Sequence, residues 1–61
     1  MFEFYKASNN NLISINPRCI VFIEPDGNSY TYISLLNGSS VMVKEKYEVV
    51  NQHLANYLAA Q

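Results

Sequence analysis

Few side chains in this sequence could do acid–base or nucleophilic chemistry. There is one histidine, His53, and one cysteine, Cys19. A general base needs an orienting partner and a substrate group within hydrogen-bond reach. The sequence indicates neither for His53, so we expect a surface or interface histidine. A catalytic thiolate needs a positive, partly open site. Cys19 instead begins an apolar strand in which Arg18 points to the opposite face, so we expect a buried structural cysteine.

The five carboxylates do not form a recognisable acid–base pair. Asp26 belongs to a turn, while Glu45 and Glu48 lie where a helix begins and negative charge complements the helix dipole. Glu24 ends a strand, and nothing in the spacing supports a pair between it and Glu3. One cysteine and one histidine are too few for a zinc site, and no P-loop, dinucleotide fingerprint or nucleophile elbow is present. We therefore expect a protein that is not an enzyme and needs no cofactor or metal.

Two tyrosines and the basic residues form the possible interaction surface. Tyr30 and Tyr32 share one face of a predicted strand, and tyrosines are common at interfaces and on base-stacking sheets. The chain has only four basic residues and a net charge of −1, which argues against a general nucleic-acid binder. We favour a core, subunit-interface or protein-binding role over nucleic-acid stacking. The surface comprises Tyr30, Tyr32, Arg18, Lys44 and Lys46; the two lysines flank Glu45 at a solvated helix start.

Hydrophobic periodicity predicts five short strands and then one helix. The run from Cys19 to Glu24 is apolar without alternation, which is typical of a strand buried on both sides. After Lys44 the apolar residues recur every three or four positions and predict a helix over about residues 45–59. Its apolar stripe is Tyr47, Val50, Leu54, Tyr57 and Leu58. The strands are expected at about residues 2–6, 12–15, 19–24, 29–36 and 39–43.

Two turns have recognisable residues. In Pro25-Asp26-Gly27-Asn28, proline fixes φ and glycine supplies a positive φ. Asn37-Gly38 predicts a two-residue hairpin loop, which places Ser34 opposite Val41 and Ile33 opposite Met42. Both faces of this hairpin are then apolar, so either the helix alone covers the second face or the helix and another subunit cover it together. One face carries Ile33, Leu35 and Met42, and the other carries Tyr32, Leu36, Val41 and Val43.

The predicted fold class is α+β, mainly β. Five short antiparallel strands form a twisted sheet or small open barrel, followed by the C-terminal helix, in a single domain over residues 1–61. A chain of 61 residues buries a small core, and one cysteine cannot form an intrachain disulfide. We therefore expect a homo-oligomer, with a dimer favoured. The longest apolar run has five residues, so we expect no membrane insertion and a cytoplasmic location.

Residues 12–54 carry a set of features that match one family of small proteins. They include Ile23-Glu24, Asn37-Gly38 and Val43-Lys44-Glu45, with a valine at 49 or 50 in the following helix. In these features the segment resembles the small flagellar FlbD-like (SwrD-type) proteins. The family usually has a serine after the glutamate, where it can cap the helix, but this chain has Lys46 there. The resemblance implies a small non-enzymatic accessory protein with a sheet-plus-helix fold. The further matches are Ile15-Asn16, Ile20, Thr31, Ile33 and Leu35.

The order of elements also resembles the carbon-storage regulator family of RNA-binding dimers, in layout and length only. The basic residues of that family's last strand are absent, because Val41, Met42 and Val43 are apolar. Three functions thus stay open. The first is a protein-interaction module, an oligomeric adaptor or modulator of a bacterial or phage process. The alternatives are a nucleic-acid-binding regulator of the small β-dimer type and a small-molecule binder at a subunit interface.

Overall fold

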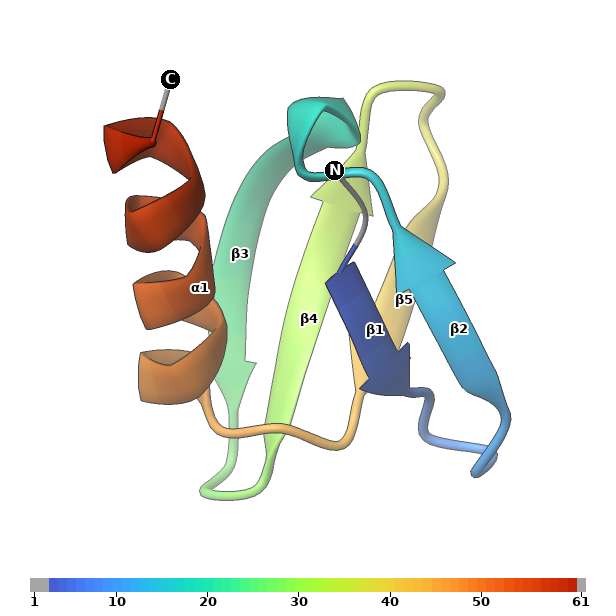
Figure 1. Cartoon of the computed structure of the whole chain (residues 1–61). Helices are drawn as coiled ribbons and strands as arrows, with labels where there is room; N and C mark the ends of the chain where they lie inside the picture. Colours follow the sequence, from blue (N-terminus) through green and yellow to red (C-terminus); the bar gives the residue numbers. More distant parts are fainter. Residues whose placement is uncertain (1–2, 61) are drawn as a thin grey trace.

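Five antiparallel strands in two sheets and one C-terminal helix make up the computed structural model, which describes residues 3–60 and the side chains from Tyr5 onward (Figure 1). The expected fold class is therefore confirmed. Phe2, the first residue of the first predicted strand, lies outside the described residues. The elements are β1 (Glu3–Lys6), β2 (Leu12–Ile15), the short 3-10 helix η1 (Pro17–Cys19), β3 (Ile20–Asp26), β4 (Tyr30–Leu35), β5 (Ser40–Val43) and α1 (Tyr47–Ala59).

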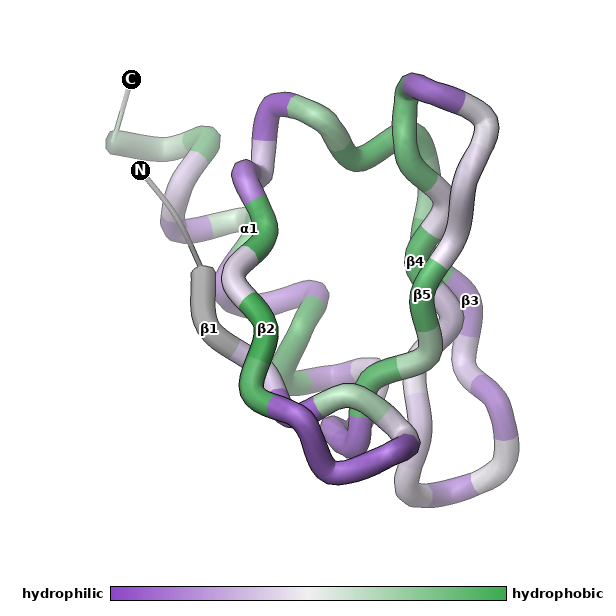
Figure 2. The backbone as a smooth tube through the Cα atoms, turned by 90° about the vertical axis from the view of Figure 1, so that its right-hand side faces the viewer, coloured by the Kyte–Doolittle hydropathy of each residue, from purple (hydrophilic) through white to green (hydrophobic). Residues whose placement is uncertain are grey.

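The two sheets are joined along β1 and β5. β1 pairs with β2, and β3, β4 and β5 form the second sheet in that order. An isolated antiparallel bridge links Ala7 to Val43, and the Lys44 N–H donates to the Lys6 carbonyl at 2.7 Å. The β1–β2 hairpin thus faces the second sheet as a separate layer (Figure 2).

The core lies between one face of each sheet and α1. Its buried side chains come from both sheets and from the helix. The odd-numbered residues of β4 and β5 point inward, and so do one face of β1–β2 and the apolar stripe of α1. Val50 and Tyr57 of the predicted stripe are buried, whereas Leu58 is 68% exposed. The core cluster is Tyr5, Ile15, Ile33, Val43 and Val50.

The predicted register of the β4–β5 hairpin is wrong by one residue. Ile33 pairs with Val41 and Ser34 with Ser40, because the Leu35 N–H donates to the Ser39 carbonyl and the loop contains residues 36–38. Gly38 provides the left-handed residue of this three-residue loop at φ 86°. A shift of one residue moves a side chain to the other face of a strand. Val41 and Val43 therefore join Ile33 on the core face, and Met42 lies with Tyr32 on the opposite face.

β3 is an edge strand, and the prediction that it is buried on both sides is wrong. Val21 and Phe22 are 56% and 47% exposed. Val21 is the extra residue of a β-bulge between the pairs formed by Ile20 and Phe22. The strand continues through Pro25, because an edge strand does not need every N–H for the ladder.

The residues at the two ends of β3 also differ from expectation. Cys19 belongs to η1 rather than to the strand, and it is half-buried. Asp26, expected in the turn, ends the strand opposite Tyr30. The turn itself contains residues 27–29, with Gly27 at φ 67°.

The helix begins two residues later than predicted. Lys46 is its N-cap in an extended conformation, and its side chain makes no capping hydrogen bond. Glu45 precedes the helix, so only Glu48 supplies negative charge in the first turn. The buried Thr31 hydroxyl donates to the Glu45 carbonyl at 2.8 Å and fixes this connection to β4. Within residues 3–60, no helix combines the length and apolar character required to cross a membrane.

Candidate functional site

An apolar groove lies between β3 and the C-terminal half of α1. Its volume is about 240 Å3. Arg18 stands at one end, where its Nε donates to the Tyr57 hydroxyl at 2.9 Å and ties η1 to the helix. The groove is lined by Pro17, Ile20, Val21, Phe22, Ile23, Leu54, Tyr57 and Leu58.

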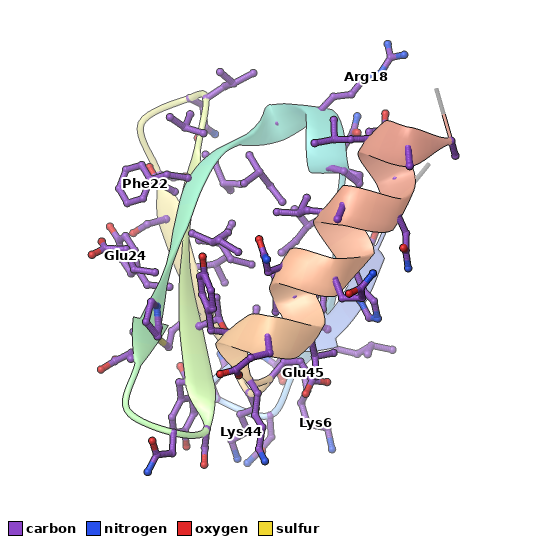
Figure 3. All side chains as sticks on the ribbon, turned by 90° about the vertical axis from the view of Figure 1, so that its left-hand side faces the viewer. Lys6, Arg18, Phe22, Glu24, Lys44 and Glu45 are labelled. Carbon is purple, nitrogen blue, oxygen red and sulfur yellow. The ribbon has the colours of Figure 1, made fainter. Side chains whose placement is uncertain are left out.

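Two side chains that line this groove are unusually exposed for apolar residues. Val21 reaches it from β3 with 56% of its surface exposed, and Leu58 reaches it from α1 with 68% exposed. Phe22 also borders the groove, but its side chain projects away from α1 (Figure 3). Single exposed apolar residues are ordinary on a protein surface, but two that flank one apolar groove indicate a contact surface. The groove is therefore the first candidate site.

The second candidate site is the side of the β3–β4–β5 sheet that faces away from α1. We call it the outer sheet face. Figure 3 shows Phe22 and Glu24 projecting on this side, away from the helix. The register places them with Ser34 and Tyr32, their partners on β4. The rings of Phe22 and Tyr32 lie 6.2 Å apart at 38°. The outer sheet face consists of Phe22, Glu24, Asp26, Tyr30, Tyr32, Ser34, Ser40 and Met42.

Acidic side chains border the aromatic residues of this face. Glu24 is opposite Tyr32 and Asp26 is opposite Tyr30, and both carboxylates are exposed. A shallow hollow of about 380 Å3 lies over Phe22, Glu24, Tyr32 and their neighbours. Negative charge beside the tyrosines is unfavourable for a phosphate backbone.

The structure does not gather the predicted interaction residues onto one surface. Arg18 and Lys44 lie at opposite ends of the molecule in Figure 3. Arg18 is bonded to Tyr57, and the Lys44 ammonium is bonded to the Asn10 side chain in the β1–β2 turn. Lys46 is exposed at the start of α1. Only Tyr30 and Tyr32 of the predicted set share a face; the set as an interaction surface stays a prediction.

His53 contacts a residue that the sequence did not indicate. Its Nδ1 is hydrogen-bonded to the Tyr5 hydroxyl at 3.1 Å, and the two rings stack with centroids 5.9 Å apart. The donor in this bond depends on the histidine tautomer. Tyr5 is part of the core cluster, so the pair fastens α1 to the β1–β2 hairpin.

The hollow near the start of α1 and the potential metal ligands give weaker evidence for a binding site. A hollow of about 610 Å3 lies between the β3–β4 turn and the start of α1. Its charged residues, Lys46 and Glu48, are exposed, so water competes for them with any ligand. Among the described residues, no three His, Cys, Asp or Glu side chains lie close enough to hold a metal ion.

Two signals in the sequence could have revealed the groove and the outer sheet face. Pro25 inside an apolar strand pattern indicates an edge strand, whose residues Val21 and Phe22 can then be exposed. A three-residue turn after Asp26 pairs Asp26 with Tyr30 and brings the acidic residues beside the tyrosines. The partnership of Tyr5 and His53 had no such signal, because 48 positions separate them.

Comparison with known proteins identifies the family. The sequence model of the FlbD family, described as flagellar and swarming motility proteins, matches residues 6–60. Neither a curated protein nor a solved structure matches the chain. The match covers all the strands from the end of β1 onward and the whole helix. This chain therefore belongs to the FlbD family of flagellar and swarming motility proteins.

Proposed function

We propose that this flagellar and swarming motility protein is a non-enzymatic protein-interaction module that works as a homodimer. The observation that carries the proposal is the apolar groove with Val21 and Leu58 exposed around it. The family supports a role in motility, and the groove supports contact between proteins.

The occupant that we propose for the groove is a second copy of the chain. A chain of 61 residues is small for a core that is stable alone, and oligomerisation is a common way to gain buried apolar surface. In a two-fold arrangement the same patch lies on both subunits. Val21 and Leu58 of each copy are then buried against the groove of the other, and the outer sheet faces stay free for a motility partner.

A pull-down tests whether the chain acts through another protein. The tagged chain is used as bait in a lysate of the source cell, with and without nuclease, and the eluate is analysed for protein and nucleic acid. We expect one dominant protein partner that survives nuclease treatment. Recovery of RNA or DNA, with proteins lost after nuclease, would overturn the proposal in favour of a nucleic-acid-binding regulator.

Matched variants connect the pull-down to the groove. Val21→Glu/Leu58→Glu places charge in the groove and is expected to prevent dimerisation. Recovery of the partner should then fall, because a monomer offers one binding surface and loses the added affinity of two linked surfaces. Leu12→Glu is the control, since Leu12 is 73% exposed on β2 and does not line the groove. Equal losses with both variants would show that the groove has no special part in the interaction.

A further inference from the structure

We propose that the outer sheet face binds a basic segment of a partner protein, one that carries at least two arginine or lysine residues among apolar ones. This inference rests on the proposed function, because it assumes a protein partner, and it assigns that partner a surface and a chemistry. It requires that the outer sheet face stay free in the dimer, which is the case when the groove joins the subunits.

The first support is that the described part of the chain leaves this face uncovered. The β1–β2 hairpin and α1 both lie on the core side of the sheet (Figure 1). Phe22 is 47% exposed, and Tyr30, Tyr32 and Met42 are half-buried only by their neighbours in the sheet. A sheet that packs on one side commonly has a polar outer face. Here the middle of that face is aromatic and apolar.

The second support is charge. Glu24 and Asp26 border the aromatic residues, and neither carboxylate forms an ion pair or hydrogen bond with another described residue. The ammonium of Lys44 is held by Asn10, and Arg18 is held by Tyr57 at the far end of the groove. The outer sheet face is therefore negative, with no cation of the described residues bound to its carboxylates.

Aromatic rings beside free carboxylates favour a cationic side chain. A guanidinium or ammonium group is attracted to the face of a tyrosine or phenylalanine ring, and it can pair with a carboxylate at the same time. Glu24 and Asp26 are two residues apart on one strand, which separates them by about 6.6 Å. Basic residues at alternate positions of an extended segment have the same spacing. Apolar side chains between them can contact Phe22 and Met42.

A binding assay with defined peptides tests the inference. The probe is a fluorescein-labelled peptide in which arginine alternates with leucine, and the comparison peptide has glutamate in place of each arginine. Anisotropy is measured against the full chain at low salt and at high salt. We expect the arginine peptide to bind, the glutamate peptide not to bind, and the binding to weaken with salt because exposed charge pairs are screened.

Charge-neutral and ring-deleting variants locate the binding. Glu24→Gln/Asp26→Asn is expected to weaken binding about tenfold, since it removes two exposed charge pairs. Tyr32→Leu removes the ring and keeps an apolar side chain, and it is expected to weaken binding by a few fold. Glu48→Gln removes an exposed carboxylate of α1 that does not belong to the outer sheet face, and it is expected to leave binding unchanged. Each variant's fold is checked by circular dichroism and urea unfolding.

Charge reversal gives the decisive comparison. Glu24→Arg/Asp26→Arg should lose the arginine peptide and gain the glutamate peptide. The inference is overturned if the arginine peptide does not bind, if Glu48→Gln weakens binding as much as Glu24→Gln/Asp26→Asn, or if RNA binds through the same residues. These outcomes leave the dimer separately testable, because Val21→Glu/Leu58→Glu changes the groove and none of these carboxylates.

Discussion

Thr31 shows how a single buried hydroxyl positions a whole element. Its side chain is fully buried, and its Oγ1 donates to the Glu45 carbonyl just before α1. Thr31→Val keeps the shape and removes the donor. We expect the free energy of unfolding to fall by about 1 kcal/mol, since one hydrogen bond to a partly buried carbonyl is lost. Urea denaturation measures this change as a lower midpoint at an unchanged slope.

Amide exchange separates the hydrogen bond of Thr31 from its packing. Thr31→Ser keeps the hydroxyl and loses only the methyl group, so the amides of Val49 and Val50 in the first turn of α1 should keep their protection. In Thr31→Val these amides should exchange faster, because the residue before the helix is no longer held. Equal protection in both variants would show that the hydroxyl does not position the helix.

At the scale of elements, the start of α1 has the backbone geometry of an N-cap but no side chain that caps it. Lys46 has φ −68° and ψ 145°, the extended geometry of an N-cap, without a capping hydrogen bond. Lys46→Ser is expected to raise the free energy of unfolding by about 0.5–1 kcal/mol, because the serine oxygen can accept from the Glu48 N–H. Thermal and urea unfolding measure the gain. Lys46→Ala removes the same charge without adding a cap; if it stabilises the protein equally, the cap is not the cause.

The kinds of element followed from local sequence, whereas the register did not. The short apolar segment at residues 12–15 and the three-and-four spacing after Lys44 predicted β2 and α1. Asn37-Gly38 marked the β4–β5 hairpin correctly. The same two residues fit a two-residue loop and a three-residue loop equally well, and a one-residue difference exchanges the faces of Val41 and Met42. The outer sheet face could not be identified until this register was known.

The exposure of β3 illustrates a second limit of the sequence. An apolar run predicts a buried strand. Composition does not show whether that strand lies in the middle or at the edge of a sheet. Val21 and Phe22 are exposed on β3, beyond which no further strand of residues 3–60 pairs. The residues after Pro25 predict a turn that includes it, although a proline is equally compatible with an edge strand.

For the whole molecule, the proposed dimer predicts a stability that depends on protein concentration. Association of folded subunits adds to the free energy of unfolding by mass action. The unfolding temperature of the native chain should therefore rise as concentration is increased tenfold, and sedimentation should show a dimer that dissociates on dilution. Val21→Glu/Leu58→Glu should remove both effects, whereas Leu12→Glu should keep them. A native chain that stays monomeric with a constant unfolding temperature would contradict the dimer.

The bulge and the proline of β3 bear on a different hazard, namely aggregation. Residues 19–23 are an uninterrupted apolar segment with β-branched and aromatic side chains, the composition that favours stacking of strands from many chains into fibrils. In the fold this segment lies at an open edge, where another strand could add. The extra residue at Val21 distorts that edge, and Glu24 and Pro25 follow with a charge and a missing donor. Natural edge strands use these same features to prevent strand addition. β3 can thus present Phe22 to a partner through its side chain while its backbone resists growth into a fibril.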